Sequence, residues 1–488
     1  MTNLVSTTAD AELGQRRRLL VLATCCLSVF VVVMDISIVN VALPAIRRDL
    51  NATQTDLQWT LDAYTLVLAG FLVLGGSTAD RLGRRRVFQV GLTVFGLGSL
   101  LCGLAPSVGW LVAARVLQAV GGTMLNPVAL AITVHTFPGR AERARVIGVF
   151  DAISGLSLAL GPILGGALVS AVGWRAVFWV NVPIVAVMIV CTALFIPDSR
   201  ADQARRFDPV GQFLVTALLG SVVYAVIESR RLGWGSPIII GLFTIAAFSV
   251  LTILVYEPRR RDPLLELRLF RSVSFSAALV MAVFALCAFG GFLFVTTQYL
   301  QDVHGMSALT AGLCMLPVGG LIMLLSPFTG RLVGARGPRL PLLAAGSALV
   351  LGGATSLCLT PDTPLIAVLA IYLLFGLFLG TANPPITNTA VSGMPRSMTG
   401  TASSLVSVGR QSGTALGVAI AGTLVGPSLA AADSAYTNAE HPVWWLTLGL
   451  GIGILALATL STTRWSKTTA TRSAALFKEL DHDTNHHR

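Results

Sequence analysis

Long apolar stretches recur along the chain from Leu19 to Ser461, and short polar turns separate them. A transmembrane helix needs roughly 20 apolar residues, and each stretch reaches about that length. Only 12% of the 488 residues are charged, whereas soluble domains carry about 25%. The chain therefore lacks the polar residues that would cover a water-facing surface, and the sequence predicts an integral membrane protein.

The apolar runs predict an all-α membrane protein with fourteen transmembrane helices. The expected spans are 19–43, 57–78, 87–106, 109–133, 145–170, 174–196, 209–228, 237–256, 274–300, 307–330, 340–360, 364–388, 400–425 and 442–463. These runs are too long and too uniformly apolar for the alternating strands of a barrel. The first run continues past Asp35 without a cleavage site, so we interpret it as a span and not as a signal peptide.

Basic residues gather in every second connection between the spans. These connections are 16–18, 81–86, 140–145, 205–206, 259–261, 331–339 and 464–467. The other connections hold few basic residues, namely Arg47, Arg48, Arg230 and Arg231, and they include the acidic residues Asp302, Asp362, Asp433 and Glu440. Cytoplasmic loops of membrane proteins are enriched in Lys and Arg. The pattern predicts an even number of spans with both chain ends in the cytoplasm.

Composition and motifs exclude several other classes of protein. The net charge of +11 lies in short clusters and forms no basic stripe, so we expect no nucleic-acid partner. All seven cysteines lie in apolar spans without a CxxC pair, which argues against a disulfide framework or a metal site. No phosphate-binding GxxxxGK[ST] loop and no clustered nucleophile is present. We therefore expect neither an enzyme nor a cofactor.

A turn between two spans has a degenerate copy later in the chain. Gly76–Arg86 joins the second and third spans, and Gly330–Arg339 joins the tenth and eleventh. If spans 7 and 8 are set aside, both turns follow the second helix of a six-helix set. The expected organisation is an N-terminal bundle over 1–198, two inserted helices over 199–265, a C-terminal bundle over 266–465 and a cytoplasmic polar tail over 466–488. Two similar halves around a central site are typical of secondary transporters.

The tail holds His482, His486 and His487. We expect it to be disordered, with metal binding as the alternative interpretation.

Five segments, in this order, resemble signatures of the major facilitator superfamily, and in particular of its fourteen-helix drug:proton antiporter family. They are Met34–Pro44, Gly76–Arg86, Arg115–Gly122, Gly161–Gly166 and Trp174–Pro183. The resemblance covers nearly the whole chain. It implies a two-domain helical fold in the cytoplasmic membrane of a bacterium, and export of lipophilic, often cationic compounds against proton influx.

The resemblance also implies that the proton gradient drives transport without a cofactor. The expected partners are a lipophilic small molecule, protons and the lipid bilayer, and we expect a monomer. The alternative is a dedicated exporter of an endogenous natural product or lipid on the same fold.

Three charged side chains inside the first spans are candidates for proton coupling. A charge at the bilayer centre costs about 2.5–3.5 kcal/mol on insertion scales and usually marks a pathway or relay. Asp35 lies within the first span and can hold a proton or attract a cation. Asp62 lies nearer the outer interface, which leaves open that solvent reaches it. We expect Arg115 to modulate the protonation of a nearby carboxylate such as Asp35, and a structural ion pair is the alternative.

Two further motifs are interpreted as conformational. The turn after the second span is expected to act as a cytoplasmic latch built from Gly76, Asp80, Arg81, Gly83 and Arg84. Gly334 occupies the position of Asp80 in the copy, so a second latch is not expected. The small residues of the fifth span are expected to pack at the interface between the halves, and the resemblance gives them a role in antiport: Gly161, Pro162, Gly165 and Gly166.

The second half offers no acidic residue within its predicted spans, so we assign proton chemistry to the first half. Candidates for substrate binding are Asp35, Asp62, Gln118, Asn126, Phe292, Gln298, Tyr299, Asn383 and Asn388. Packing is the alternative role for the aromatic ones. Asn383-Pro384-Pro385 is expected to break the twelfth span. Arg410 is expected to extend toward the inner interface.

Overall fold

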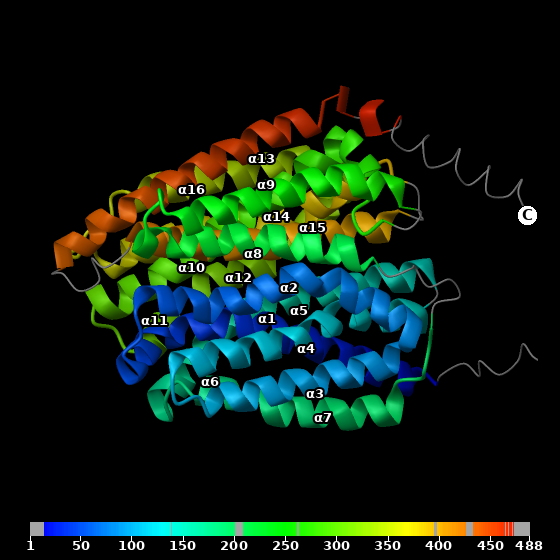
Figure 1. The fold of residues 1–488 in the computed structure, drawn as a ribbon, viewed down its shortest axis with the longest axis horizontal. Coiled ribbons are helices and arrows are strands. Elements are labelled where there is room, and N and C mark those ends of the chain that lie inside the picture. Colours follow the sequence, from blue (N-terminus) through cyan, green and yellow to red (C-terminus); the bar gives the residue numbers. More distant parts are fainter. Residues whose placement is uncertain are drawn as a thin grey trace, which may run out of the picture.

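The computed structural model describes residues 14–137, 139–200, 208–260, 263–394, 398–425, 433–463, 465–466, 468–470 and 472. The basic residues at 205–206, Arg261, Arg464 and Lys467 lie outside this part of the chain, as do the tail over 473–488 and its histidines. The described residues form a bundle of helices that run side by side (Figure 1).

The helices of the first part of the chain are α1 Gln15–Leu50, α2 Gln54–Leu82, α3 Arg84–Gly103, α4 Val108–Thr136, α5 Arg140–Ala171, α6 Ala176–Trp179, α7 Asn181–Phe195, α8 Pro209–Leu232 and α9 Pro237–Tyr256. Those of the second part are α10 Val273–Gln298, α11 Ala308–Leu313, α12 Leu316–Arg336, α13 Arg339–Ser356, α14 Leu365–Val391, α15 Thr399–Val425 and α16 Asp433–Ser461. Short 3₁₀ turns lie at Glu257–Arg259 (η1) and Leu267–Arg271 (η2), and a π-helical turn at Tyr299–Val303 (η3) follows α10.

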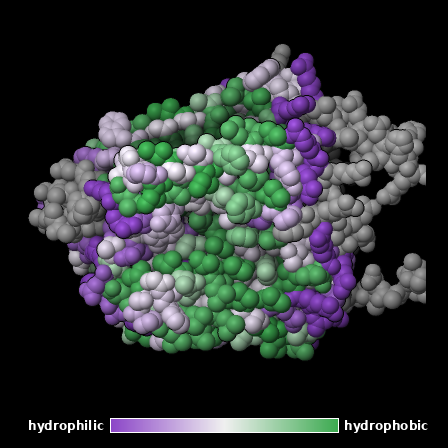
Figure 2. Space-filling view, in the orientation of Figure 1, coloured by the Kyte–Doolittle hydropathy of each residue, from purple (hydrophilic) through white to green (hydrophobic). Residues whose placement is uncertain are grey.

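The surface of the bundle suits lipid. Figure 2 shows apolar residues across the middle of the molecule and polar residues gathered at its two ends. Large apolar side chains are exposed on the helices, among them Phe213, Phe248 and Leu251. Apolar patches of this extent are unusual on soluble monomers. In the described residues, twelve helical segments are long and apolar enough to cross a membrane.

The expected count of fourteen spans is not confirmed. Every predicted span coincides with helix, but α13 and α15 are not among the twelve segments that meet the length and composition needed to span. Gly, Ser and Thr lower the hydropathy of both helices, and each contains an arginine, Arg339 or Arg410. Their small residues serve packing within the bundle more than contact with lipid.

The helices pack in two groups, and two further helices, α8 and α9, lie beside them. We call α1–α7 the first half and α10–α16 the second half, which lie below and above in Figure 1. The inserted helices α8 and α9 pack on each other, and α8 also contacts α2 and α15. The start of α1 and the end of α16 lie on the same side of the bundle. We call this the terminal side and the opposite one the distal side.

Local signals explain where helices begin and end. Thr53 and Asp56 form a capping box at the start of α2, in which the backbone N–H of Asp56 donates to the Thr53 hydroxyl at 3.2 Å. Gly83 separates α2 from α3 with a φ of 104°, a conformation that side chains with a Cβ rarely adopt. This turn lets two long helices reverse direction within one residue.

Glycine allows the closest helix crossing of the second half. On α15, Gly413 faces the backbone of Val283, and Gly417 faces the backbone carbonyl of Cys287 on α10. A Cβ at Gly417 would overlap that carbonyl. Small residues at such crossings let helix backbones approach each other in a membrane. This contact joins the central helix α10 to α15.

The prolines of α14 do not break it, so that expectation is wrong. The helix runs through Pro384 and Pro385 to Val391. Proline removes backbone donors from a helix, and a membrane tolerates this where neighbouring groups satisfy the freed carbonyls. The two prolines free the carbonyls of Gly380 and Thr381, four residues earlier. Arg410 of α15 bonds to other groups of the same helix, since its Nη2 donates to the Asn383 backbone carbonyl at 3.4 Å and to the Thr387 hydroxyl at 2.6 Å. Arg410 therefore bonds to α14, which the expectation of an extended side chain did not include.

An acidic residue of the second half lies inside the bundle, which corrects a second expectation. Glu440 belongs to α16, and its residue is 1% exposed. The indole N–H of Trp444, one turn later, donates to it at 3.3 Å. We predicted an outer loop here because the apolar run begins after Glu440. The helix instead begins at Asp433, and Trp444 on the same face covers the carboxyl group.

The α10–α15 crossing yields a test of packing. We expect Gly417→Val to destabilise the protein by about 1–3 kcal/mol, because the new side chain has no space against Cys287. Thermal unfolding of the detergent-solubilised protein measures the effect. Gly449→Val on α16 is the matched control, since nothing lies within 4 Å of a Cβ at Gly449. Equal unfolding temperatures for the two variants would contradict this account of the crossing.

Candidate functional site

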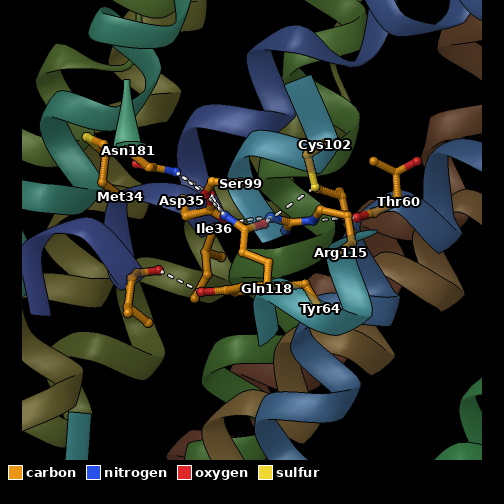
Figure 3. A network of polar contacts seen from close by, with 12 residues as sticks. Met34, Asp35, Ile36, Thr60, Tyr64, Ser99, Cys102, Arg115, Gln118 and Asn181 are labelled. Carbon is orange, nitrogen blue, oxygen red and sulfur yellow. Dashed lines mark hydrogen bonds and ion pairs between the residues drawn. The ribbon is translucent and has the colours of Figure 1, made fainter. Parts of the chain in front are cut away.

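A buried ion pair joins α1 to α4 in the middle of the first half. Asp35 and Arg115 are both 0% exposed, and Nη1 of Arg115 contacts Oδ2 of Asp35 (Figure 3). Asp35 lies on α1 and Arg115 on α4, so residues that are 80 positions apart meet inside the bundle. The two charges compensate each other away from water.

Amide side chains complete the donors around Asp35. Gln118 Nε2 donates to Asp35 Oδ1 at 2.8 Å, and Asn181 Nδ2 donates to the same oxygen at 3.1 Å. Both amides also donate to the hydroxyl of Ser99 on α3, at 2.7 and 3.2 Å. Asp35 thus accepts from an arginine and two amides. An ionised carboxylate only accepts hydrogen bonds, so this set of donors suits the charged form.

The guanidinium of Arg115 is held on its other sides too. Its Nε donates to the carbonyl of Thr60 on α2 at 3.0 Å, and its Nη1 donates to Gln118 Oε1 at 2.7 Å. The ring of Tyr64 lies 4.1 Å from Cζ of Arg115, a cation–π distance. The network therefore draws on α1, α2, α3, α4 and α7, which are most of the helices of the first half.

The stability of the fold depends on both charges of such a buried ion pair. Taking both charges out of water costs several kcal/mol for each ion, and their attraction repays this cost only with good geometry and further hydrogen bonds. Here the further bonds are present. If one charge disappears, the other is left buried without compensation.

Asp62 is buried too, but apart from this network. Its residue is 0% exposed, so the alternative that solvent reaches it is wrong. In the described residues, Oδ1 receives the Thr65 hydroxyl at 3.4 Å and Oδ2 has no hydrogen-bond partner. Thr60 and Tyr64 face Arg115, and a helix places positions two residues apart on nearly opposite faces. Asp62 therefore shares its face with Gln58, and Gln58 Nε2 donates to the carbonyl of Ala419 on α15 at 2.8 Å.

A narrow cavity lies between the two halves beside these groups. In this state it has room for about one water molecule. The lining combines residues of α1, α2 and α4 with residues of α10 and α15: Ile36, Asn40, Leu61, Thr65, Arg115, Gly290, Leu293, Thr414 and Val418. Asn40 is 4% exposed, and its Oδ1 has no partner in the described residues. The cavity is largely apolar, with Arg115 at its first-half wall.

The predicted latch segment lies at the terminal end of α2. Asp80 pairs with Arg84, the first residue of α3, at 3.1 Å. The backbone N–H of Arg84 donates to the Ser199 carbonyl at 2.9 Å. These contacts lie within the first half and link α2, α3 and the segment after α7. Its role as a latch stays a prediction.

The small residues of α5 face two partners. Gly161 and Gly165 lie against Ser37 and Ile38 of α1, within the first half. Pro162 and Gly166 lie against the second half, where the Pro162 carbonyl faces Gly312 and Gly166 faces Ala308, both on α11. The motif is thus a two-sided packing surface whose second side forms the seam between the halves. Its part in antiport stays a prediction.

The structure places the other substrate-binding candidates away from the cavity. Phe292 stacks on Phe375 at a centroid distance of 4.0 Å inside the second half. Gln298 donates to the Phe294 carbonyl of its own helix at 2.9 Å, and the Tyr299 hydroxyl donates to the Thr360 carbonyl at 2.8 Å.

Asn126 and Asn383 are half-buried and Asn388 is exposed. Gln118 belongs to the network of Asp35.

Sequence reasoning missed several members of this site. Ser99 and Tyr64 carry no charge and stand alone in apolar helices, so nothing in the pattern marks them. Asn40 and Asn181 fall within the segments Met34–Pro44 and Trp174–Pro183, and they were not predicted as site residues. A buried amide in an apolar span needs a partner, and that requirement could have drawn attention to both asparagines.

Comparisons with known proteins agree with this architecture. The family model of the Major Facilitator Superfamily matches residues 25–418. The chain is 36% identical to the multidrug resistance protein Stp of Mycobacterium tuberculosis, over 85% of this chain and 77% of that protein. It is also 36% identical to the tetracenomycin C resistance and export protein of Streptomyces glaucescens, over 81% of this chain and 74% of that protein.

Among solved structures, a bacterial homologue of the human lysosomal transporter Spinster has a similar fold. The TM-score is 0.62 with 18% identity, over 94% of this chain and 99% of that one.

The buried ion pair yields a test of its energetics. We expect Arg115→Gln to destabilise the protein by about 3–5 kcal/mol, because Asp35 is then left without its counter-charge. The double variant Asp35→Asn/Arg115→Gln should recover much of that loss, since it buries no charge. Thermal unfolding of the purified variants measures both. A double variant that is less stable than Arg115→Gln would contradict the electrostatic explanation.

Proposed function

Because the chain belongs to the Major Facilitator Superfamily and is an integral membrane protein, we propose that it is a proton-coupled antiporter that exports lipophilic, cationic compounds by alternating access. The relatives named for multidrug resistance and for resistance and export support efflux as the direction of transport. The observation that carries the proposal is the pair of buried carboxylates, Asp35 and Asp62, beside a cavity between the halves.

Asp35 is the main proton site in this proposal. A proton on Asp35 removes the charge that compensates Arg115, so the network of Gln118, Asn181 and Ser99 must rearrange. Arg115 also lines the cavity. A change at Asp35 therefore alters the wall that a substrate contacts. This gives a physical route by which proton binding and substrate binding exclude each other.

Asp62 serves as the second carboxylate and favours cations. Its Oδ2 has no partner in the described residues, and Thr65, which donates to Oδ1, lines the cavity. A cation that enters between the halves would supply the missing counter-charge, and a proton would supply it in the absence of a cation. One proton for one monovalent cation is electroneutral, and a second proton adds about 2.3 kcal/mol per 100 mV of membrane potential.

The remaining features follow from this function. We propose that α13 and α15 also cross the membrane, for fourteen spans in all, with the two halves as bundles and α8–α9 as an inserted pair. The terminal side faces the cytoplasm of a bacterial cell, as the arginine clusters indicate. The proton gradient supplies the energy without a cofactor, and the transporter acts as a monomer. Asp80 and Arg84 act as the cytoplasmic latch, and Gly161–Gly166 as the antiporter motif.

A second candidate function is dedicated export of one endogenous natural product or lipid. The similarity to a resistance and export protein for tetracenomycin C favours it. The lining of the cavity is largely apolar, which suits an apolar product as well as a lipophilic cation once the halves separate further. The two functions differ in substrate range and share the expected proton coupling.

One experiment separates these functions and tests Asp35. The purified protein is reconstituted in vesicles with an acidic interior, and uptake of a panel of lipophilic cations and neutral antibiotics is measured. Antiport predicts accumulation of several cations that a protonophore abolishes, whereas dedicated export predicts accumulation of one compound class. We expect Asp35→Asn to lose about 100-fold or more of the gradient-driven uptake, in the range found when a proton-transfer group is removed. Wild-type uptake by Asp35→Asn would refute its role.

The role of Asp62 has its own measurement. We expect Asp62→Asn to lose the stimulation of monovalent-cation uptake by an imposed membrane potential, because one protonatable group is gone. Uptake of a neutral substrate should keep at least about half of its rate, since the network of Asp35 is intact. Thr65→Val, which removes only the hydroxyl donor of Asp62, is the control that keeps the carboxyl group. An unchanged dependence on potential in Asp62→Asn would count against this assignment.

A further inference from the structure

The two halves meet along their distal parts. Gly319 of α12 lies against Ala159 of α5. A Cβ built on Gly155 of α5 would lie 3.2 Å from Cγ2 of Ile322 on α12. Farther toward the terminal side, Gly148 of α5 and Gly334 of α12 have nothing within 4 Å of such a Cβ. The two helices therefore touch in their distal portions and diverge toward the terminal side. The structure is closed at the distal side of this seam.

An ion pair crosses the seam at the distal surface. Nη2 of Arg47, in the last turn of α1, lies 2.8 Å from Oδ2 of Asp302 in the π-helical turn η3. Their side chains are 24% and 23% exposed, so the pair is mostly shielded from water. Of the ion pairs that we find in the described residues, this one joins the first half to the second. Its charges gain more from contact than a fully solvated surface pair would.

Two neighbouring hydrogen bonds cross the seam beside this pair. Gln301, the residue before Asp302, donates through Nε2 to the Val41 carbonyl of α1 at 3.0 Å. The backbone N–H of Leu309 on α11 donates to the hydroxyl of Ser170 on α5 at 3.3 Å. Consecutive residues of η3 thus hold α1 at points six residues apart. π-Helical turns often occur at functional sites, because the extra residue redirects side chains.

We propose that Arg47 and Asp302 form a distal latch, which holds the outer exit closed in this state and must separate for release. The inference rests on the proposed export by alternating access, which requires the distal side to open in turn. The latch acts across the halves, whereas Asp80 and Arg84 pair within the first half. Neither Arg47 nor Asp302 belongs to the network of Asp35.

A second distal ion pair provides a matched control. Asp49 of α1 pairs with Arg175 at 2.6 Å, just before α6, and both belong to the first half. Asp49 lies two residues after Arg47, so the two pairs occupy the same end of the same helix. Loss of the Asp49 pair removes a distal ion pair without touching the seam. A difference between the two variants therefore reports on the contact between the halves.

The test measures the distance between the halves directly. Spin labels are attached at Val172→Cys and Ile366→Cys, in a protein whose native cysteines are replaced. Both positions are highly exposed, at 69% and 76%, and lie in distal segments of different halves. Pulsed electron paramagnetic resonance then gives the distribution of distances between the two labels in detergent. We expect Arg47→Gln and Asp302→Asn each to raise the long-distance population by up to about fivefold.

Three further variants decide the outcome. The double variant Arg47→Gln/Asp302→Asn should add little to either single variant, since one interaction is lost in all three. The exchanged pair Arg47→Asp/Asp302→Arg should restore part of the short-distance population. Asp49→Asn should leave the distribution unchanged.

An unchanged distribution in both single variants, or the same shift in Asp49→Asn, would overturn the proposal. Arg47→Lys, which retains the charge, should keep most of the closed population and serves where Arg47→Gln does not fold. The measurement needs neither substrate nor gradient, so a failed latch and a failed antiport are distinguishable.

Discussion

The buried contact between Asp35 and Arg115 is the interaction on which the first half depends. Its charges are expensive inside a bilayer unless each compensates the other. Compensation requires α1 and α4 to approach in one register, and the amides of Gln118 and Asn181 then bring α3 and α7 to the same point. A group that orders five helices through one carboxylate transmits a change of charge to all of them.

Asp35 and Asp62 are both buried, but their electrostatic environments are opposite. Asp35 accepts from an arginine and two amides, whereas Asp62 has one weak donor and an oxygen without a partner in the described residues. Environments that differ so strongly separate the tasks of two carboxylates. Asp62 also shares its helix face with Gln58, which contacts the second half. Asp62 therefore lies on the face of α2 that turns toward the second half, whereas Asp35 pairs with Arg115 beside the cavity.

The seam itself is built differently along its length. Glycines bring α5 against α11 and α12 in the distal part, and the ion pair of Arg47 and Asp302 closes the surface above them. Toward the terminal side the same helices diverge. Small residues make a contact that can slide or separate at low cost, whereas an ion pair gives the closed state a specific lock. The combination suits a joint that must open repeatedly.

Much of this architecture could be predicted from residue types, because a bilayer admits few solutions. The length of each apolar run predicted its helix, and the arginine clusters predicted that the first helix begins on the side where the last one ends (Figure 1). The cost of an unpaired charge pointed to a partner for Arg115, and spacing placed Gly161–Gly166 at a packing surface. These inferences needed only local sequence and the solvent.

Other features were decided by tertiary contacts. Burial of Asp62 depends on α15, which packs over α2. Burial of Glu440 depends on a helix that begins before the apolar run and on the cover from Trp444. Arg410 of α15 bonds to α14, and the pairing of Arg47 with Asp302 joins residues of different halves. Sequence determined which segments enter the membrane, since that depends only on the free energy of moving one segment from water into lipid. Only the tertiary structure decided which polar groups meet, because hydrogen bonds and ion pairs depend on the register between helices far apart in the chain.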